Sequence, residues 1–267
     1  MSTIAIWINS EESKSIWAVS DTRYSSPDNH NLVTDYGPKI YEMQIICKKP
    51  DTTGFMNQIY WQQKIGIAFA GKAIIALCII TNINKILSSL VSTEDAIPSI
   101  IDIHKLVERI ACQYTTPIIN NNPIEFSTFG YCYLEKKFKI FTTQIPRRGN
   151  SVSEDNSEFC ENEVLLLGSH KAEIREKIVA YKALNEMHSI NRIPLIIIKD
   201  IIKKSEYLDI GGGIQLGITL GINFELFSIA EPIGDGSAKA TLKYTNIDMF
   251  SEIKTVGNCF VSIHGMA

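Results

Sequence analysis

Short blocks of hydrophobic positions separated by polar turns mark the first part of the chain. A mostly apolar run over 4–8 precedes a polar turn and a second run over 15–25, which predicts two strands folding back on each other. Two further strands are predicted over 39–46 and 60–71, joined by the turn sequence CKKPDTTG. The chain therefore opens with a series of antiparallel strands.

The hydrophobic period then changes to that of helices. A segment over about 72–90 is apolar nearly all round, which predicts a helix that is buried on most sides. A second helix is predicted from Thr93, which can cap it, with Glu94 and Asp95 in the first turn where the helix dipole favours acidic residues. These two segments form a first predicted helix pair.

Further strands and a second helix pair follow. The pattern predicts strands over 125–134, 137–145 and 163–168, a mobile polar linker over 146–162, a helix capped by Ser169 and ending near Glu186, a helix over 194–205, and strands over 211–220, 222–229, 238–245 and 259–265. Helix pairs between antiparallel strands argue against a doubly wound parallel sheet. They favour an α+β fold of the αββα four-layer type, with two stacked antiparallel sheets flanked by helix pairs.

The composition of the chain argues against several kinds of binding partner. A net charge of -3 over 267 residues gives no electrostatic reason to expect binding to nucleic acid or to an anionic membrane. The longest apolar stretch carries Lys72 and is shorter than the roughly 20 residues that a membrane-spanning helix needs. The six cysteines lack paired spacing, which suits reduced thiols in the cytoplasm, and no pattern points to a metal or cofactor.

The first candidate for chemistry lies at the start of the chain. Ser2 is a small residue, so Met1 is expected to be removed and the α-amine of Ser2 to become free. A serine hydroxyl needs a base to attack a carbonyl, and an α-amine, which titrates near about 8, can take that proton. Ser2 would then be both nucleophile and base, as in N-terminal-threonine variants of the catalytic triad. The plain alternative is that Met-Ser-Thr is an ordinary start.

Three more positions suit such a site. Asp21 ends the second predicted strand and Lys39 begins the next, and a lysine held by a carboxylate beside an amine would lower the proton affinity of that amine. Gly71 lies between a strand and a helix, where a backbone N–H can receive an oxyanion. Taken singly, an ordinary surface ion pair and a glycine in a tight turn explain these residues equally well.

The order of short motifs adds a resemblance. SDTRYS, GPKIYEM and IGIAFAGKA, followed by Gly168-Ser169 and Gly211-Gly212-Gly213, resemble the proteasome β-subunit family of N-terminal nucleophile hydrolases, including bacterial ring peptidases, over about 2–229. The resemblance implies one domain over 1–233, with 234–267 as a C-terminal extension of extra strands packed on it. It assigns catalytic roles to Ser2, Asp21, Lys39, Gly71, Ser169 and, with its motif one position out of step, Asp209. It assigns substrate contacts to Ser25 and Arg23.

The resemblance also implies a function. It indicates a serine/threonine-type peptidase that cleaves peptides or unfolded chains without a cofactor, as a homo-oligomer in a ring or helical stack that can work with a separate ATPase unfoldase. Two alternatives stay open. One is a catalytically inactive structural subunit of the same kind, and the other is a hydrolase of small amides on the same scaffold. Departures include Ser in place of the usual first Thr and a long excursion between Lys39 and Gly71.

Overall fold

The structure, a computed structural model, describes residues 3–11, 13–26, 31–115, 123–145, 151–161, 163–185, 191–233 and 240–266. Sheets predominate, and four α-helices occur among these residues, so the predicted α+β class is confirmed. The chain divides into two compact units, each formed from separate stretches of sequence. The first contains Met1–Ile40, Glu161–Ile218 and Leu226–Ala267, and the second contains Tyr41–Cys160 and Thr219–Glu225.

The first unit is built on an eight-stranded sheet with the order β11-β1-β2-β12-β13-β14-β15, in which β18 also pairs with β13. Its first hairpin joins β1 (Thr3–Asn9) to β2 (Ser15–Asp21), as the two apolar runs predict, and Trp7 lies opposite Trp17. The other strands are β11 (Leu165–Gly168), β12 (Ile214–Leu220), β13 (Asn223–Pro232), β14 (Ala240–Tyr244), β15 (Ile247–Asp248) and β18 (His264–Met266).

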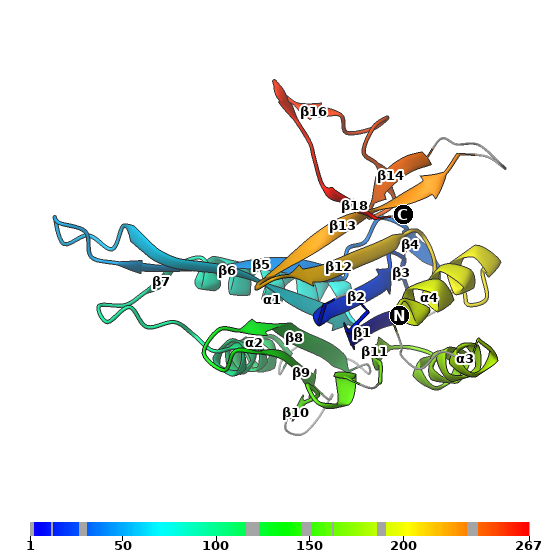
Figure 1. Cartoon of the computed structure of the whole chain (residues 1–267), viewed down its shortest axis with the longest axis horizontal. Coiled ribbons are helices and arrows are strands. Elements are labelled where there is room, and N and C mark those ends of the chain that lie inside the picture. Colours follow the sequence, from blue (N-terminus) through cyan, green and yellow to red (C-terminus); the bar gives the residue numbers. More distant parts are fainter. Residues whose placement is uncertain are drawn as a thin grey trace. The chain divides into compact units, whose positions relative to one another are not determined.

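Two helices complete the core of the first unit. Helix α3 (Lys171–Leu184) and helix α4 (Ile193–Lys204) supply isoleucines that pack with Ala5, Trp7 and Val19 of the first hairpin. Both helices lie beside the strands of this sheet in Figure 1. Because the first hairpin is fixed from this side by buried apolar side chains, the ends of β1 and β2 have well-defined positions.

Several short elements complete the first unit. A small sheet pairs β3 (Tyr24–Ser25) with β4 (Leu32–Thr34), and another pairs β16 (Thr255–Val256) with β17 (Cys259–Phe260). Three strands of the predicted C-terminal extension belong to the main sheet, because β14 pairs with β13 and with β15, and β18 runs parallel to β13. Residues 234–239 and 267 lie outside the described residues, and the domain boundary at 233 stays a prediction.

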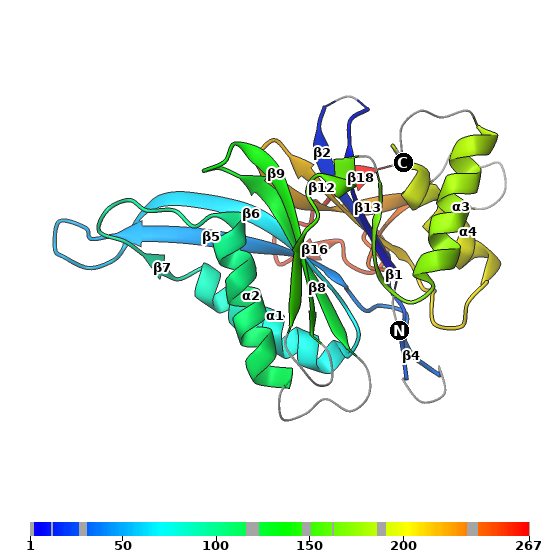
Figure 2. The same ribbon diagram turned by 90° about the horizontal axis from the view of Figure 1, so that it is seen from below.

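The second unit contains a six-stranded sheet with the order β10-β9-β8-β6-β5-β7. The strands are β5 (Ile40–Lys49), β6 (Gln58–Ala70), β7 (Leu90–Val91), β8 (Ile124–Cys132), β9 (Lys137–Ile145) and β10 (Val152–Asp155). Helices α1 (Ala73–Leu87) and α2 (Ile100–Thr115) pack against each other, and α2 contacts β8 and β9. Figure 2 shows both helices along this sheet.

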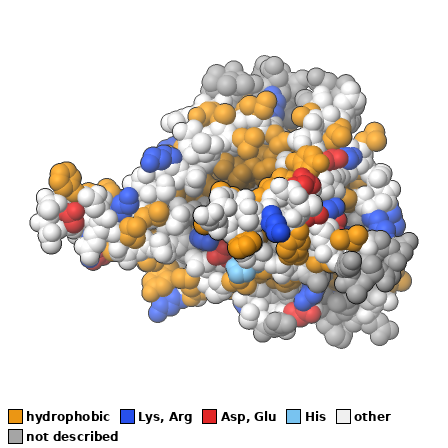
Figure 3. Space-filling model, turned by 90° about the horizontal axis from the view of Figure 1, so that it is seen from above, with side chains coloured by type: hydrophobic (Ala, Val, Ile, Leu, Met, Phe, Trp, Pro, Cys, Tyr) orange, Lys and Arg blue, Asp and Glu red, His pale blue; other side chains and the backbone are white. Residues whose placement is uncertain are grey.

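The β5–β6 hairpin accounts for the long excursion between Lys39 and Gly71. It projects at the left of Figure 1, and hydrophobic side chains are visible at that end in Figure 3. Phe55, near the turn, is 68% exposed. Because this large apolar side chain is exposed, the turn end of the β5–β6 hairpin lies at the surface and not in the core.

Two helix predictions in this unit are corrected. Helix α1 is not buried on most sides, because its buried residues follow one stripe whereas Ile74 is 79% exposed. Helix α2 begins at Ile100 and not at Thr93. The residue before a proline avoids helical geometry, so Pro98 opposes a helix that runs through from Thr93, and Ser99 caps the helix by accepting the N–H of Asp102 at 3.2 Å.

The predicted mobile linker over 146–162 is also corrected. Its described part contains β10, which pairs with β9, and the 3₁₀ turn η1 (Phe159–Glu161). Residues 146–150 and 162 lie outside the described residues. In the described part of the chain, no helix is long and apolar enough to cross a membrane.

Candidate active site

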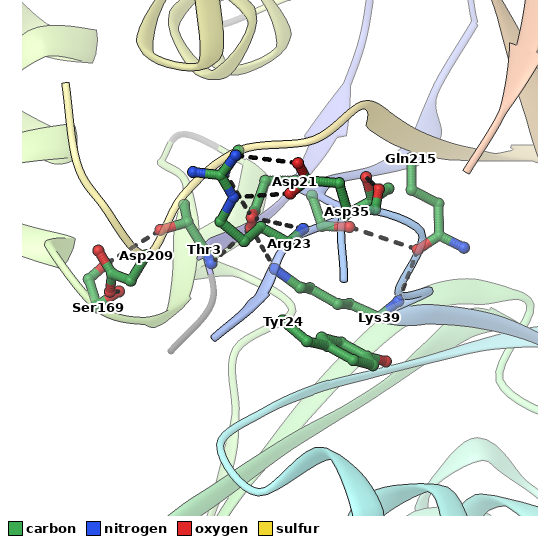
Figure 4. Close-up of polar contacts among 12 residues, drawn as sticks. Thr3, Asp21, Arg23, Tyr24, Asp35, Lys39, Ser169, Asp209 and Gln215 are labelled. Carbon is green, nitrogen blue, oxygen red and sulfur yellow. Dashed lines mark hydrogen bonds and ion pairs between the residues drawn. The ribbon is translucent and has the colours of Figure 1, made fainter. Parts of the chain in front are cut away.

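A single buried carboxylate organises the end of the first hairpin. Asp21 is the last residue of β2 and is fully buried. Its Oδ1 accepts the backbone N–H of Thr3 at 3.1 Å and the ammonium of Lys39 at 2.6 Å, whereas its Oδ2 accepts the N–H groups of Arg23 and Gly211, each at 3.1 Å. Figure 4 shows Thr3, Arg23 and Lys39 around this carboxylate. Four donors hold it in one orientation.

Lys39 is as deeply buried as its partner. Its side chain is 0% exposed, and its ammonium lies 5.9 Å from the centre of the Tyr24 ring. Burial lowers the pKa of the Lys39 amine, and the neighbouring Asp21 carboxylate opposes this effect. The geometry excludes the ordinary surface ion pair that the sequence left open, because exposed pairs of that kind are solvated on both sides.

Gln215 of β12 fixes the backbone that carries the lysine. Its Oε1 accepts the N–H groups of Lys39 and Ile40 at 2.8 and 2.9 Å, and its Nε2 donates to the carbonyl of Ile40 at 2.7 Å. The side chain is 0% exposed. These three hydrogen bonds from one buried amide hold the backbone of Lys39 and Ile40 beside the Gln215 side chain.

Other groups pack closely against the three consecutive glycines before β12. A Cβ at Gly211 would lie 2.4 Å from the guanidinium carbon of Arg23, and one at Gly212 would lie 2.6 Å from the Thr22 hydroxyl oxygen. Gly212 also has a φ of +74°, which side chains disfavour. The backbone N–H of Thr22 is shared between the carbonyls of Gly211 and Gly213, both at 3.1 Å. The glycines thus bring this loop against the end of β2.

The two predicted substrate contacts have different surroundings. The Arg23 guanidinium forms a bidentate pair with Asp35, with N–O distances of 2.7 and 3.1 Å. Within the described residues, the hydroxyl oxygen of Ser25 is buried without a hydrogen-bond partner. The orientation of Arg23 is therefore set by Asp35, whereas Ser25 retains hydrogen-bonding capacity. Their contact with a substrate stays a prediction.

Ser169 and Asp209 form a second cluster beside Thr3. The Thr3 hydroxyl donates to the carbonyl of Ser169 at 3.3 Å, and the Ser169 hydroxyl donates to Asp209 Oδ2 at 2.7 Å. The imidazole of His170 lies 3.0 Å from Asp209 Oδ1. Burial opposes ionisation of Asp209, but the hydrogen bonds from Ser169 and His170 outweigh it and lower the pKa of the carboxyl group.

The role predicted for Ser169 as a helix cap is wrong. The residue at the cap position of α3 is His170, and the Ser169 side chain is directed to Asp209 instead. Nor does this cluster form a serine–histidine–aspartate triad, in which the histidine lies between the other two. Here the aspartate lies between serine and histidine, so the imidazole is not placed to take a proton from Ser169.

The remaining predicted positions are only partly described. Ser2 lies outside the described residues, and its assignment as nucleophile stays a prediction. Gly71 belongs to the second unit, with a φ of +121°, and a Cβ there would lie 2.8 Å from the carbonyl oxygen of Pro123. The structure thus explains why glycine is needed at this turn, and its role as an oxyanion donor stays a prediction.

Three residues at the site were missed by sequence reasoning. These are Gln215, Asp35 and His170. The signal for Gln215 was present, because it is the one amide in the otherwise apolar run GIQLGITL. Asp35 and His170 carry no such signal, since a polar residue in a loop is ordinary. Among the described residues, no group of three or more His, Cys, Asp or Glu could hold a metal ion.

Comparison with known proteins gives a structural similarity only. No family model and no curated protein matches the sequence. The helical assembly of the Anbu complex from Pseudomonas aeruginosa has a TM-score of 0.55 at 13% identity, covering 89% of this chain and 88% of that one. Anbu (ancestral beta-subunit) from Yersinia bercovieri has a TM-score of 0.54 at 12% identity, covering 82% of this chain and 81% of that one. An Anbu (Gly-1) mutant from Hyphomicrobium sp. strain MC1 has a TM-score of 0.52 at 15% identity, with the same two coverages of 82% and 81%.

These similarities correct the family named from the sequence motifs. The assignment to the proteasome β-subunit family with its ring peptidases is wrong, because the similar structures are Anbu proteins, which are proteasome-like but form a distinct family. Identities of 12–15% show a shared fold and no more. The function of this chain must therefore be argued from its own residues.

Proposed function

We propose that this chain is an N-terminal nucleophile amidohydrolase that cleaves peptide bonds with Ser2 after removal of Met1. The observation that carries the proposal is the shared oxygen of Asp21, whose Oδ1 binds both the Thr3 N–H and the Lys39 ammonium. The Thr3 nitrogen is the atom to which Ser2 is bonded in the chain. A buried charge pair is therefore one peptide bond away from the proposed nucleophile.

In the proposed reaction the α-amine of Ser2 takes the hydroxyl proton as the oxygen attacks the substrate carbonyl. The Lys39 ammonium would favour the unprotonated amine before attack, because two neighbouring cations repel each other. The leaving amine takes the proton as the amide C–N bond breaks, and an ester to Ser2 remains. The α-amine of Ser2 then takes a proton from water as the water oxygen attacks this ester, and it returns the proton to the serine oxygen as the ester bond breaks. Gly71 is assigned the oxyanion N–H on its sequence motif alone.

Other parts of the proposal extend from the fold. Each unit carries one large sheet and one helix pair, which supports the four-layer αββα sandwich expected from the sequence. The Anbu complex from Pseudomonas aeruginosa forms a helical assembly, and we extend homo-oligomer formation to this chain. Light scattering should therefore give a mass well above that of one 29.9 kDa chain, and a monomer at micromolar concentration would contradict this part. A separate ATPase partner stays a prediction.

The decisive experiment changes only what precedes Ser2. Native protein should lack the mass of Met1, hydrolyse peptides and be acylated once per chain by a β-lactone. A version with a cleavable tag fused directly before Ser2 should fold. Its Ser2 nitrogen is then part of an amide and cannot accept a proton, so this version should neither hydrolyse peptides nor be acylated by the β-lactone. Releasing the tag should restore both reactions.

Two substitutions serve as matched controls. Ser2→Thr keeps the hydroxyl and the amine and should remain active, whereas Ser2→Ala should lose activity by a factor on the order of 10² or more. Equal rates before and after tag release would refute the mechanism. Retention of Met1 on native protein would favour an inactive structural subunit, and turnover of small amides without peptides would favour the small-amide hydrolase.

A further inference from the structure

A histidine that the proposed mechanism does not use lies beside the second cluster. His170 follows Ser169 in the turn between β11 and α3, and its Nε2 lies 3.0 Å from Asp209 Oδ1. Its ring also stacks on Tyr207, with 3.9 Å between the centres and 23° between the planes. The imidazole is therefore held both at its edge and on its face.

Hydrogen-bond polarity in this cluster follows from the charge of Asp209. This residue is 4% exposed, and among the described residues each oxygen of its carboxylate has one side-chain partner. An ionised carboxylate only accepts hydrogen bonds, so the proton lies on the His170 Nε2 and on the Ser169 hydroxyl, both of which donate. Because the hydroxyl has a single hydrogen, the Ser169 oxygen can act only as an acceptor toward any other group.

The location makes this polarity relevant to the start of the chain. The Ser169 carbonyl accepts the hydroxyl of Thr3, and Thr3 also pairs with Gly168 across β1 and β11. An oxygen that only accepts can bind an N–H of an amine and cannot donate to its lone pair. The Ser169 oxygen can therefore orient an amine through one N–H and leave the lone pair of that amine available to act as a base.

We propose that His170 is a positioning residue, which holds the Asp209 carboxylate in place so that the Ser169 hydroxyl is kept as an acceptor for the α-amine of the proposed nucleophile. This inference rests on the proposed function. The imidazole itself takes no proton from substrate. Without its N–H, the carboxylate can rotate and the Ser169 hydroxyl can turn its hydrogen toward the amine, blocking the lone pair that acts as the base.

Two substitutions of His170 separate the stacking of its ring from the hydrogen bond that its Nε2 donates. His170→Phe keeps a ring to stack on Tyr207 but has no donor for Asp209. His170→Gln loses the ring, but its Nε2 reaches about as far as the imidazole Nε2 and can donate to the carboxylate. A positioning role needs the donor alone, whereas acid–base catalysis by the imidazole would require the ring nitrogen to exchange a proton.

The experiment measures peptide hydrolysis by tag-released protein and, separately, the titration of the Asp209 carboxyl group by NMR. In His170→Phe we expect kcat to fall by about tenfold or more with KM unchanged, and the carboxyl pKa to rise. In His170→Gln the kcat and the Asp209 carboxyl pKa should both be close to those of the wild type. Ser2→Ala is measured in parallel and should be inactive in either background.

The outcomes are distinguishable from those of the proposed function. An inactive released wild type, or an active Ser2→Ala, overturns the proposed function and this role with it. An active wild type with unchanged kcat or unchanged Asp209 titration in His170→Phe overturns the positioning role alone. Failure of His170→Gln to restore kcat also overturns it, because the ring nitrogen would then be needed for proton transfer.

Discussion

Replacing Lys39 with methionine tests whether the buried charge pair is both structural and chemical. Methionine has a similar length and apolar volume, so the substitution removes the ammonium with little change in packing. Lys39 and Asp21 are both 0% exposed and are 2.6 Å apart. Removing one charge therefore leaves the other in a site that water does not reach.

The expected loss in the free energy of unfolding follows from this burial. Breaking a buried ion pair by removing one partner costs about 3–5 kcal/mol. Asp21 keeps three backbone N–H donors after the change, from Thr3, Arg23 and Gly211, which places the expectation near the lower end, at about 3 kcal/mol. That is a large part of the roughly 5–15 kcal/mol that stabilises a typical protein.

Urea unfolding followed by tryptophan fluorescence is a suitable assay, because Trp7 and Trp17 are buried in the core of the same unit. Lys14→Met is the matched control. Lys14 pairs with Glu161 at the surface, where both side chains are about half exposed (49% and 47%), so its loss should cost less than about 1 kcal/mol. Asp21→Asn combined with Lys39→Met should cost less than the sum of the single changes, because neither charge is then left alone.

A loss below about 1 kcal/mol for Lys39→Met would refute the reasoning, since it would mean that the site is solvated. Additive losses in the double variant would show that the two side chains do not depend on each other. In tag-released protein, the same substitution should also slow acylation of Ser2 by a factor on the order of 10². Full activity would remove Lys39 from the proposed mechanism.

Two further predictions concern stability. The His104 imidazole is buried, which lowers its pKa to about 4, so between the usual value of 6.5 and about 4 the unfolded chain takes up a proton that the folded chain does not. The free energy of unfolding should fall by about 3 kcal/mol from pH 7 to pH 4, and a urea-midpoint profile that is the same in His104→Gln would contradict this. Gly212→Ala should cost about 1–3 kcal/mol or more, because its Cβ would meet Thr22 at 2.6 Å, whereas Gly54→Ala (φ +86°) meets no atom within 4 Å and should lower the melting temperature less. Equal melting temperatures for the two glycine variants would show that this loop is not tightly packed.

Local sequence was sufficient wherever an element depends on near neighbours. The first hairpin, the β8–β9 hairpin and helix α4 begin and end within a few residues of their predicted bounds. Predictions failed where a residue had a competing role. Pro98 with Ser99 delayed α2, and the hydroxyl of Ser169 was taken up by Asp209, forty residues further along the chain, instead of the helix that follows it.

The site divides in the same way. The sequence singled out Asp21 and Lys39 by their positions at strand ends, whereas the site roles of Ser169 and Asp209 came only from the resemblance of the surrounding motifs to a known family. It did not show that Asp21 has four donors or that Gln215 holds the lysine backbone. Apart from the local N–H of Arg23, those contacts span between 18 and 190 residues, so they depend on how distant segments are brought together.

By itself the sequence determined the α+β class, the order of strands and helix pairs, and a short set of polar residues at element ends. These follow from hydrophobic period and turn chemistry, which act over a few neighbouring residues. The tertiary structure decided which of those residues meet. It joined Asp21 to Lys39 and to Thr3 in a buried site, and it set Asp209 between Ser169 and His170. The physical reason is that charge pairing and hydrogen bonding act at distances near 3 Å, and only the packing of distant segments creates such distances.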